Sequence, residues 1–185
     1  MDWMLSTVGR ALKLVTSVKE PVMRTKGTDI VAAILFGGVI AATIDIGAAS
    51  IISGRSPTFI MQAIAAGLLG KASFGGGVPT MILGAFLQEA MGILIAGIYV
   101  LPAKAMPALS RRWALGGLGY GVVIFFVMNY AVVPLSALKA VPQFTALKFA
   151  ENMTAMLIFG LIVAFFCARA TASAEPARNE AILPA

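Results

Sequence analysis

The sequence predicts an all-α membrane protein built on a four-transmembrane-helix bundle. The chain of 185 residues is 59% hydrophobic and only 12% charged, and its mean hydropathy is +0.93. Soluble domains carry about 25% charged residues. Most of the charged residues lie outside long apolar runs. Lipid is therefore the predicted solvent of those runs, and we interpret the net charge of +6 as membrane-surface and topology charge.

The composition also excludes several kinds of functional site. The chain has no histidine and a single cysteine, Cys167, which we interpret as a small buried apolar residue. These counts exclude Ser-His-Asp and Cys-His catalysis, Cys/His zinc sites, histidine-ligated haem and an intramolecular disulfide bond. No cluster of basic residues on a polar surface indicates nucleic-acid binding. We therefore predict no metal, no cofactor and no enzymatic activity.

Residues 1–20 are predicted to form an amphipathic helix that lies in the membrane interface. Apolar residues such as Met4, Val8 and Leu12 recur there at helical spacing, with the basic residues away from the apolar stripe. A short soluble helix or a frayed tail is the alternative interpretation. Polar residues interrupt the apolar stretches too often for a secretory signal. At the other end, residues 170–185 are predicted to be a disordered tail.

Four apolar runs between these ends are long enough to cross about 30 Å of hydrocarbon. They form the predicted membrane domain, residues 30–168, and they cover residues 30–52, 79–101, 113–133 and 149–168. A short helix, 57–70, follows the first run. It begins at Ser56-Pro57, a favourable N-cap followed by a favourable first helical residue. It is too short to cross, so we predict a re-entrant or interfacial helix, followed by a flexible turn at 71–77.

Small residues predict which helix faces pack together, because they let backbones approach closely. The first two spans each carry a face of Gly and Ala residues at helical spacing, and the third contains a G-x-x-x-G pair. The predicted packing glycines are Gly38, Gly92, Gly117 and Gly121. The glycine run of the third span does not resemble a nucleotide-binding loop, since no strand precedes it and no acidic residue follows at the required distance.

The distribution of basic residues predicts the orientation. With four spans, one side holds both termini and the loop with Arg111 and Arg112, which together carry most of the 14 Lys and Arg residues. The positive-inside rule places that side in the cytoplasm. If the short helix 57–70 were a fifth span, the Arg111/Arg112 loop would lie outside. The charge distribution therefore favours four spans with both termini cytoplasmic.

The polar residues of the spans are predicted to share a pocket in the outer half of the bundle. At 1.5 Å per residue, Asp45 lies about 10 Å, Glu89 about 15 Å and Asn129 about 6 Å from the outer ends of their spans. Gln88 can supply an amide to either carboxylate. Arg55 and Glu151 are placed at the mouth of the pocket.

Two carboxylates in a surrounding of low dielectric constant favour proton binding, which is what a proton-linked carrier or relay requires. The alternative interpretation is that Asp45, Glu89 and Asn129 only hydrogen-bond one helix to another. Arg55 can instead extend to lipid headgroups, and Glu151 can form a surface ion pair with Lys148.

Two segments of the chain are similar to a known family. The run D-I-G-A-A-S-I-I-S-G-R-S-P from Asp45 to Pro57 and the run Q-A-I-A-A-G-L-L-G from Gln62 to Gly70 resemble uncharacterised bacterial four-span inner-membrane proteins, distantly YagU-like and of unknown function. The resemblance covers roughly residues 30–168. It implies a four-span fold in the bacterial inner (cytoplasmic) membrane and no established activity. Family members often carry histidines near Gln88 and in the last span, and this chain has none.

Two classes of function remain open at the level of the sequence. The first is a small inner-membrane carrier or channel, linked to protons, with the polar pocket as its site. The second is a non-catalytic accessory or assembly subunit, which packs on a second copy of itself or on a larger membrane complex. A membrane enzyme that acts on lipid is disfavoured, because no set of metal ligands and no activated nucleophile is visible.

Overall fold

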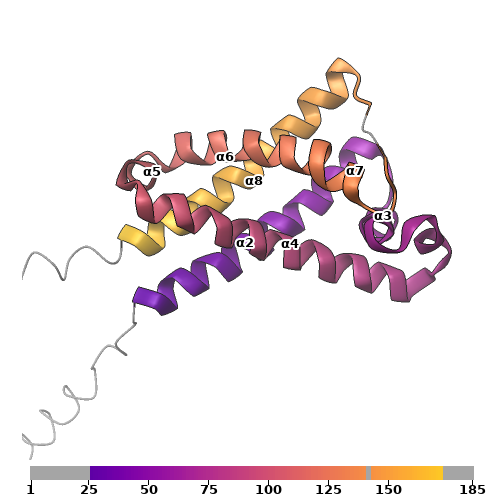
Figure 1. Cartoon of the computed structure of the whole chain (residues 1–185), viewed down its shortest axis with the longest axis horizontal. Helices are drawn as coiled ribbons and strands as arrows, with labels where there is room; N and C mark the ends of the chain where they lie inside the picture. Colours follow the sequence, from indigo (N-terminus) through magenta and orange to yellow (C-terminus); the bar gives the residue numbers. More distant parts are fainter. Residues whose placement is uncertain (1–25, 141–142, 173–185) are drawn as a thin grey trace, which may run out of the picture.

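The computed structural model describes residues 26–140 and 143–172, and this part of the chain is helical without strands (Figure 1). The elements in chain order are α2 (Lys26–Ser53), α3 (Pro57–Leu69), the 3₁₀ helix η1 (Gly70–Gly75), α4 (Gly77–Ala105), α5 (Pro107–Arg111), α6 (Trp113–Val127), the π-helical η2 (Met128–Val132), α7 (Val133–Leu135) and α8 (Ala146–Ala172). The predicted interfacial helix at 1–20 lies outside the described residues. The disordered tail predicted at 170–185 begins too early, because α8 continues through residue 172, and the remainder of that tail lies outside the described residues.

Four helical segments are long and apolar enough to cross a membrane, which confirms the predicted multi-pass helical bundle. They are Gly27–Ser53, Gly77–Ala105, Trp113–Leu135 and Ala146–Ala170. Each extends past the predicted apolar run at one or both ends. The predicted loop with Arg111 and Arg112 is mostly helical, because α4 continues through Pro102 and α5 follows it. We call the two ends of the bundle the α3 end and the α5 end; α2 begins and α8 finishes at the α5 end (Figure 1).

Three pairs of helices pack with their backbones close together, because glycine residues lie at the contacts. Helix α8 packs along both α2 and α6, and α2 also packs along α4. A Cβ atom at Gly38 would lie 2.8 Å from the carbonyl oxygen of Gly92, and one at Gly121 would lie 2.5 Å from that of Met156. A Cβ atom at Gly117 would meet the carbonyl oxygen of Gly160 at 2.8 Å. All four predicted packing glycines therefore lie where two backbones touch.

The α4–α6 contact is wider and is made by large side chains. The hydroxyl of Tyr120 on α6 donates a hydrogen bond to the carbonyl oxygen of Ile95 on α4, at 2.7 Å. The rings of Tyr99 and Tyr120 lie 4.9 Å apart between their centroids. Large side chains therefore fill the space between these two helices.

The short helix α3 is fixed against the first half of α4. The hydroxyl of Ser56 accepts the N-cap hydrogen bond from the backbone N–H of Phe59, at 3.3 Å. Ala65 and Ala66 are fully buried. Gly84 touches the backbone of Met61 so closely that a Cβ atom there would overlap its carbonyl oxygen. This helix thus forms a hairpin with α4 at one end of the bundle (Figure 1).

The segment that follows α3 was predicted to be a flexible turn, and that prediction is wrong. Residues 70–75 form the 3₁₀ helix η1, with Ser73 fully buried. The Ser73 hydroxyl donates to the carbonyl oxygen of Gln62 at 2.8 Å, and the Ser73 carbonyl accepts from the Thr80 hydroxyl at 2.8 Å. The Gln62 amide also donates to the carbonyl oxygen of Gly77, at 3.2 Å. These bonds satisfy backbone groups that would be costly to leave unpaired at the edge of a membrane.

The third span continues two residues further than predicted. The predicted run ends at residue 133, just before Pro134, but the helix runs through a π-helical turn at Met128–Val132 to Leu135. Proline lacks a backbone N–H and cannot make the usual α-helical bond to the preceding turn. The chain accommodates it by widening that turn, so that the N–H of Val133 donates to the carbonyl oxygen five residues earlier, on Met128.

Candidate functional site

Asp45 lies on α2 and is hydrogen-bonded across the bundle to α4. The amide Nε2 of Gln88 donates to the Asp45 carboxyl oxygen Oδ2 at 3.0 Å and makes a longer contact with the carbonyl oxygen of Ala42, at 3.4 Å. The close approach of α2 and α4 at Gly38 and Gly92 brings the two side chains within reach. Asp45 is half-buried, so the structure places a carboxyl group and an amide together inside the membrane-spanning region.

A cavity of about 30 Å³ lies beside this pair, between the four spanning helices. Its lining residues are Asp45, Gln88, Met91, Gly92, Ile95, Ile124, Met128, Met156 and Phe159. Asp45 and Gln88 are the polar side chains of this lining. The volume is enough for a water molecule, which needs about 10–15 Å³ measured this way. It is too small for an organic solute.

Glu89 does not reach this cavity, contrary to the shared pocket predicted from the sequence. Neighbouring residues of an α-helix point about 100° apart, so Gln88 faces the cavity while Glu89 faces the contact between α4 and α2. There the Thr43 hydroxyl donates to Glu89 Oε1 at 3.1 Å. The second oxygen, Oε2, is buried and has no hydrogen-bond partner in the described part of the chain.

Asn129 also lies away from the cavity. Its amide Nδ2 donates to the carbonyl oxygen of Phe125 on its own helix, at 2.9 Å. Its neighbour Met128 lines the cavity instead. The π-helical turn that begins at Met128 sets which of the two faces inward, and a periodicity of 3.6 residues does not anticipate that turn. The predicted trio of Asp45, Glu89 and Asn129 thus reduces to Asp45 with Gln88.

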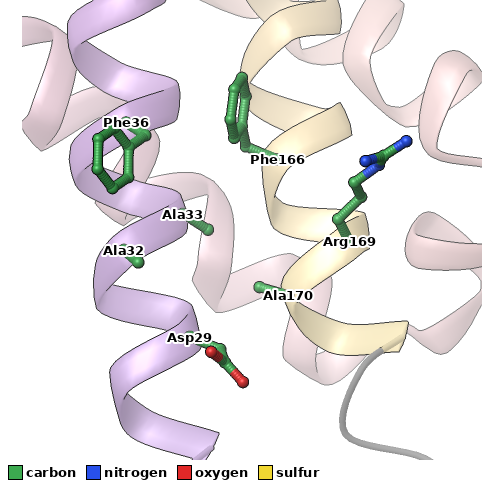
Figure 2. Close-up of a pocket in the computed structure, with 7 residues that line it drawn as sticks. All are labelled: Asp29, Ala32, Ala33, Phe36, Phe166, Arg169 and Ala170. Atoms are coloured by element: carbon green, nitrogen blue, oxygen red, sulfur yellow. The ribbon is translucent and has the colours of Figure 1, made fainter. Parts of the chain in front are cut away.

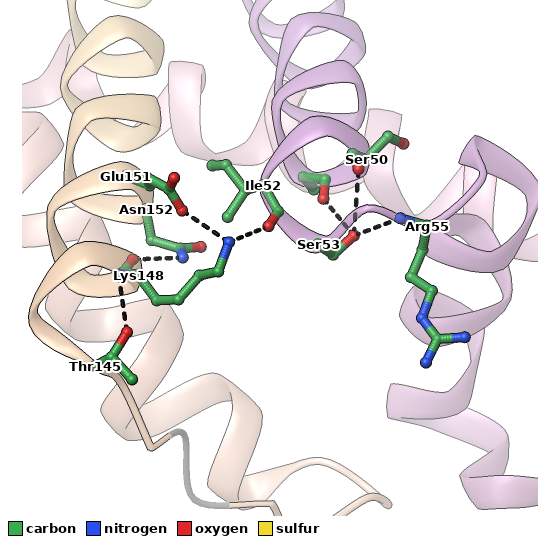
Figure 3. Close-up of polar contacts among 9 residues, drawn as sticks. Ser50, Ile52, Ser53, Arg55, Thr145, Lys148, Glu151 and Asn152 are labelled. Carbon is green, nitrogen blue, oxygen red and sulfur yellow. Dashed lines mark hydrogen bonds and ion pairs between the residues drawn. The ribbon is translucent and has the colours of Figure 1, made fainter.

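The residues placed at the pocket mouth do not converge either (Figure 3). The guanidinium carbon of Arg55 lies 4.9 Å from the centroid of the Phe59 ring, and Figure 3 shows this side chain directed away from α8. Glu151 instead accepts from Lys148 at 2.9 Å. Lys148 also donates to the carbonyl oxygen of Ile52 in the last turn of α2. These contacts join α8 to α2 at the α3 end.

Lys148 is therefore expected to hold the ends of α2 and α8 together. Replacing it by methionine removes both bonds, and because the side chain is 45% exposed we expect a loss of about 1 kcal/mol in unfolding free energy. Thermal unfolding in detergent measures the change. The same replacement at Lys71, an exposed residue of η1, is the control and should leave the unfolding temperature unchanged. Equal unfolding temperatures for both variants would contradict this role.

Sequence reasoning missed two hydroxyl groups toward the α5 end of the bundle. Ile95 lines the cavity, and its carbonyl oxygen accepts the hydrogen bond from Tyr120. Tyr120 in turn contacts Tyr99, which is buried in the same core cluster as Cys167. The tyrosines alternate with apolar residues and show no motif spacing. Only the three-dimensional contact through Ile95 connects them to Asp45.

Residues 26–140 and 143–172 contain no group of three His, Cys, Asp or Glu side chains that could hold a metal ion. Comparisons with known proteins found no matching protein-family model, no similar curated protein and no similar solved structure. The arrangement of the described residues therefore has to support any functional interpretation by itself.

Proposed function

We propose that the protein passes protons across the membrane and that Asp45 is the residue that binds and releases them. The supporting observation is the position of its carboxyl group, beside a water-sized cavity between four spanning helices. Gln88 donates a hydrogen bond to one oxygen of this carboxyl group and holds it in place. An acid next to a single water site is a minimal element of a proton relay.

The size of the cavity favours a proton over a larger cargo. A volume of about 30 Å³ admits a water molecule and leaves no room for a sugar, an amino acid or a nucleoside. Met91, Met128 and Met156 make up part of its wall. Unbranched methionine side chains change rotamer readily, so water can reach the acid through small side-chain movements.

Tyr120 and Tyr99 continue the proposed path toward the α5 end. A hydroxyl group can both donate and accept a hydrogen bond, and can therefore pass a proton between waters. The Tyr120 hydroxyl donates a hydrogen bond to the carbonyl oxygen of Ile95, a residue that lines the cavity. In this proposal the protein lies in the bacterial inner membrane. The α5 end, with Lys104, Arg111 and Arg112, faces the cytoplasm together with both termini.

Proton flux into vesicles that contain only this protein tests the proposal. A potassium diffusion potential, set by valinomycin, drives protons inward, and a pH-sensitive dye inside the vesicles records the flux. The wild-type protein should acidify the lumen faster than protein-free vesicles. A rate equal to that of protein-free vesicles would overturn the proposal.

The Thr43–Glu89 pair favours a second candidate function, that of an accessory or assembly subunit. Glu89 lies twelve residues from the start of α4, about 18 Å along the helix and close to mid-membrane. Thr43 is exposed and Glu89 is partly exposed, so this polar pair lies on the outer surface of the four-helix bundle, where lipid would contact it. Polar groups at such depth usually pair with another helix. A helix of a second copy or of another subunit would cover this exposed polar pair, which supports a homo-oligomer or docking within a larger complex.

Cysteine crosslinking tests this second candidate. Thr43→Cys, in a chain whose own cysteine is removed by Cys167→Ala, should give a disulfide-linked dimer in oxidised native membranes. Val123→Cys, at an exposed position of α6, should stay monomeric as the matched control. If Thr43→Cys is as monomeric as the control, two copies do not meet at this contact.

A further inference from the structure

The cavity at Asp45 is bounded toward the α3 end by methionine side chains. Helices α2 and α6 run toward that end, whereas α4 and α8 run away from it (Figure 1). Among the lining residues, Met128 on the third span and Met156 on α8 are therefore the nearest to the α3 end on their helices. Both are partly buried and pack against the hydrophobic core. A proton that enters from the outer side has to pass this part of the wall.

The larger groove of the bundle does not lead to this cavity. It has a volume of about 350 Å³ and lies between the beginning of α2 and the end of α8 (Figure 2). A Cβ atom at Gly37 would lie 3.0 Å from the Phe166 Cβ, so the two helices touch beside the groove. Asp45 is eight residues, about 12 Å, further along α2. The groove and the cavity share no lining residue.

Met128 is the first residue of the π-helical turn η2, and this turn is a point where the third span can bend. Pro134 has no N–H, and the N–H of Val133 bonds to the carbonyl oxygen of Met128, five residues earlier instead of four. Sharp bends in helices occur at prolines and π-helical turns, and such turns frequently lie at functional sites. Because Met128 belongs to η2, a bend there changes how far its side chain reaches into the cavity.

The segment beyond η2, which consists of α7 and the turn at 136–140, is attached to α3. The backbone N–H of Ala137 donates to the carbonyl oxygen of Gly67, in the last turn of α3, at 2.8 Å. A Cβ atom at Gly67 would lie 3.8 Å from the Ser136 Cβ. Helix α3 is itself seated on α4 through the backbone contact at Gly84. A single hydrogen bond adds little net stability, so this attachment can open and close while α3 stays in place.

We propose that Met128 is the gate through which the cavity at Asp45 opens toward the α3 end, with η2 as its hinge and the Ala137–Gly67 bond as its latch. With the latch closed, Met128 separates the cavity from the outer side. With the latch open, α7 pivots away from α3, Met128 withdraws and water reaches Asp45. This gate is the outer counterpart of the tyrosine path toward the α5 end. Its role in proton passage rests on the proposed function, whereas the movement of Met128 does not.

A disulfide across the latch tests the proposal. The 3.8 Å between the Cβ positions at residues 67 and 136 matches the distance in disulfide-bonded cysteines, about 3.5–4.5 Å. The double variant Gly67→Cys, Ser136→Cys is made in a parent chain that carries Cys167→Ala. Oxidation should crosslink it within the chain, and proton flux into vesicles should fall to the protein-free rate. Reduction should restore the flux of the parent.

Ser136→Cys alone, in the same parent, is the matched control. It removes the same hydroxyl, which donates to the carbonyl oxygen of Val133 and accepts from the N–H of Leu138, but it cannot form a crosslink within the chain. Treated with the same oxidant, it should keep the flux of the parent. An equal loss of flux in this single variant would assign the effect to the missing hydroxyl and would overturn the gate.

Methionine oxidation reports the movement of Met128 without relying on proton flux. Hydrogen peroxide converts an accessible methionine to its sulfoxide, and mass spectrometry of peptides locates the change. In the crosslinked protein, Met128 should be oxidised more slowly than in the parent. Met106 is 49% exposed and follows the last turn of α4 at the α5 end, so it should be oxidised at the same rate in both.

The two measurements separate the gate from proton passage itself. If the parent passes no protons but the crosslink slows the oxidation of Met128, the gate stands and proton passage does not. If the crosslink leaves the oxidation of Met128 unchanged, the gate is wrong whether or not the parent passes protons. Parent flux through the crosslinked protein would also overturn it. So would failure of the double variant to crosslink, because the two positions would then not meet.

Discussion

Vesicles that contain Asp45→Asn are expected to acidify no faster than protein-free vesicles. Asparagine can still accept the hydrogen bond that Gln88 donates to Asp45 at 3.0 Å, so the contact between α2 and α4 is preserved. What the substitution removes is the proton that a carboxylic acid exchanges with water. The variant therefore separates proton exchange from helix packing, which Asp45→Leu would not do. Size-exclusion profile and helical content should match the wild type.

The control for this result is Thr154→Val, a nearly isosteric change on α8. The Thr154 hydroxyl is exposed and donates to the carbonyl oxygen of Ala150 on its own helix, away from the cavity. Wild-type flux is expected in this variant. If Asp45→Asn passes protons at the wild-type rate, Asp45 serves as a hydrogen-bonding contact between helices and the proposed relay is wrong. Glu89→Gln adds a further comparison, because flux lost there instead would move the site to the α2–α4 contact.

The four spans could be predicted from the sequence because hydrocarbon thickness fixes how long an apolar run must be. Glycine positions could be predicted to pack because a missing Cβ atom matters in any close helix pair, as it does at Gly38 and Gly92. These properties depend on composition and spacing alone. The short helix that follows Ser56-Pro57 belongs to the same class, since its N-cap residue and its first proline are local signals.

The candidate site was predictable only in part, because depth along a helix is easier to estimate than direction around it. Asp45, Gln88 and Glu89 were placed at similar depths, yet a rotation of about 100° separates the cavity-facing Gln88 from Glu89. The direction of Asn129 was predicted wrongly because this residue lies in a π-helical turn, which changes the direction of the side chains it contains. Lys148 was predicted to pair with Glu151, but its bond to Ile52 depends on how two distant helix ends meet.

Gly84→Ala should be the most destabilising single-methyl change at the α3–α4 hairpin. A Cβ atom at this position would overlap the carbonyl oxygen of Met61, and a backbone carbonyl cannot turn aside as a flexible side chain can. Helix α3 must move away from α4, which exposes Ala65 and Ala66. Overpacking of this kind costs about 1–3 kcal/mol. Cys167 is buried in the core, so a thiol-reactive dye reports unfolding of the whole bundle on heating.

Gly97→Ala is the matched control on the same helix. The nearest atom to its Cβ would be Ile34 Cγ2 at 4.0 Å, which is an ordinary contact, and alanine favours the helix over glycine by about 0.8–1 kcal/mol. Its unfolding temperature should equal or exceed that of the wild type.

A local displacement of α3 can leave the unfolding of the bundle unchanged, so a second readout is needed at α3 itself. With Cys167 replaced by alanine, Ala65→Cys should react slowly with a thiol reagent while α3 is seated on α4, because Ala65 is fully buried. It should react faster once Gly84→Ala is added. Unchanged reactivity at position 65 together with an unchanged unfolding temperature would mean that α3 does not depend on the close contact at Gly84.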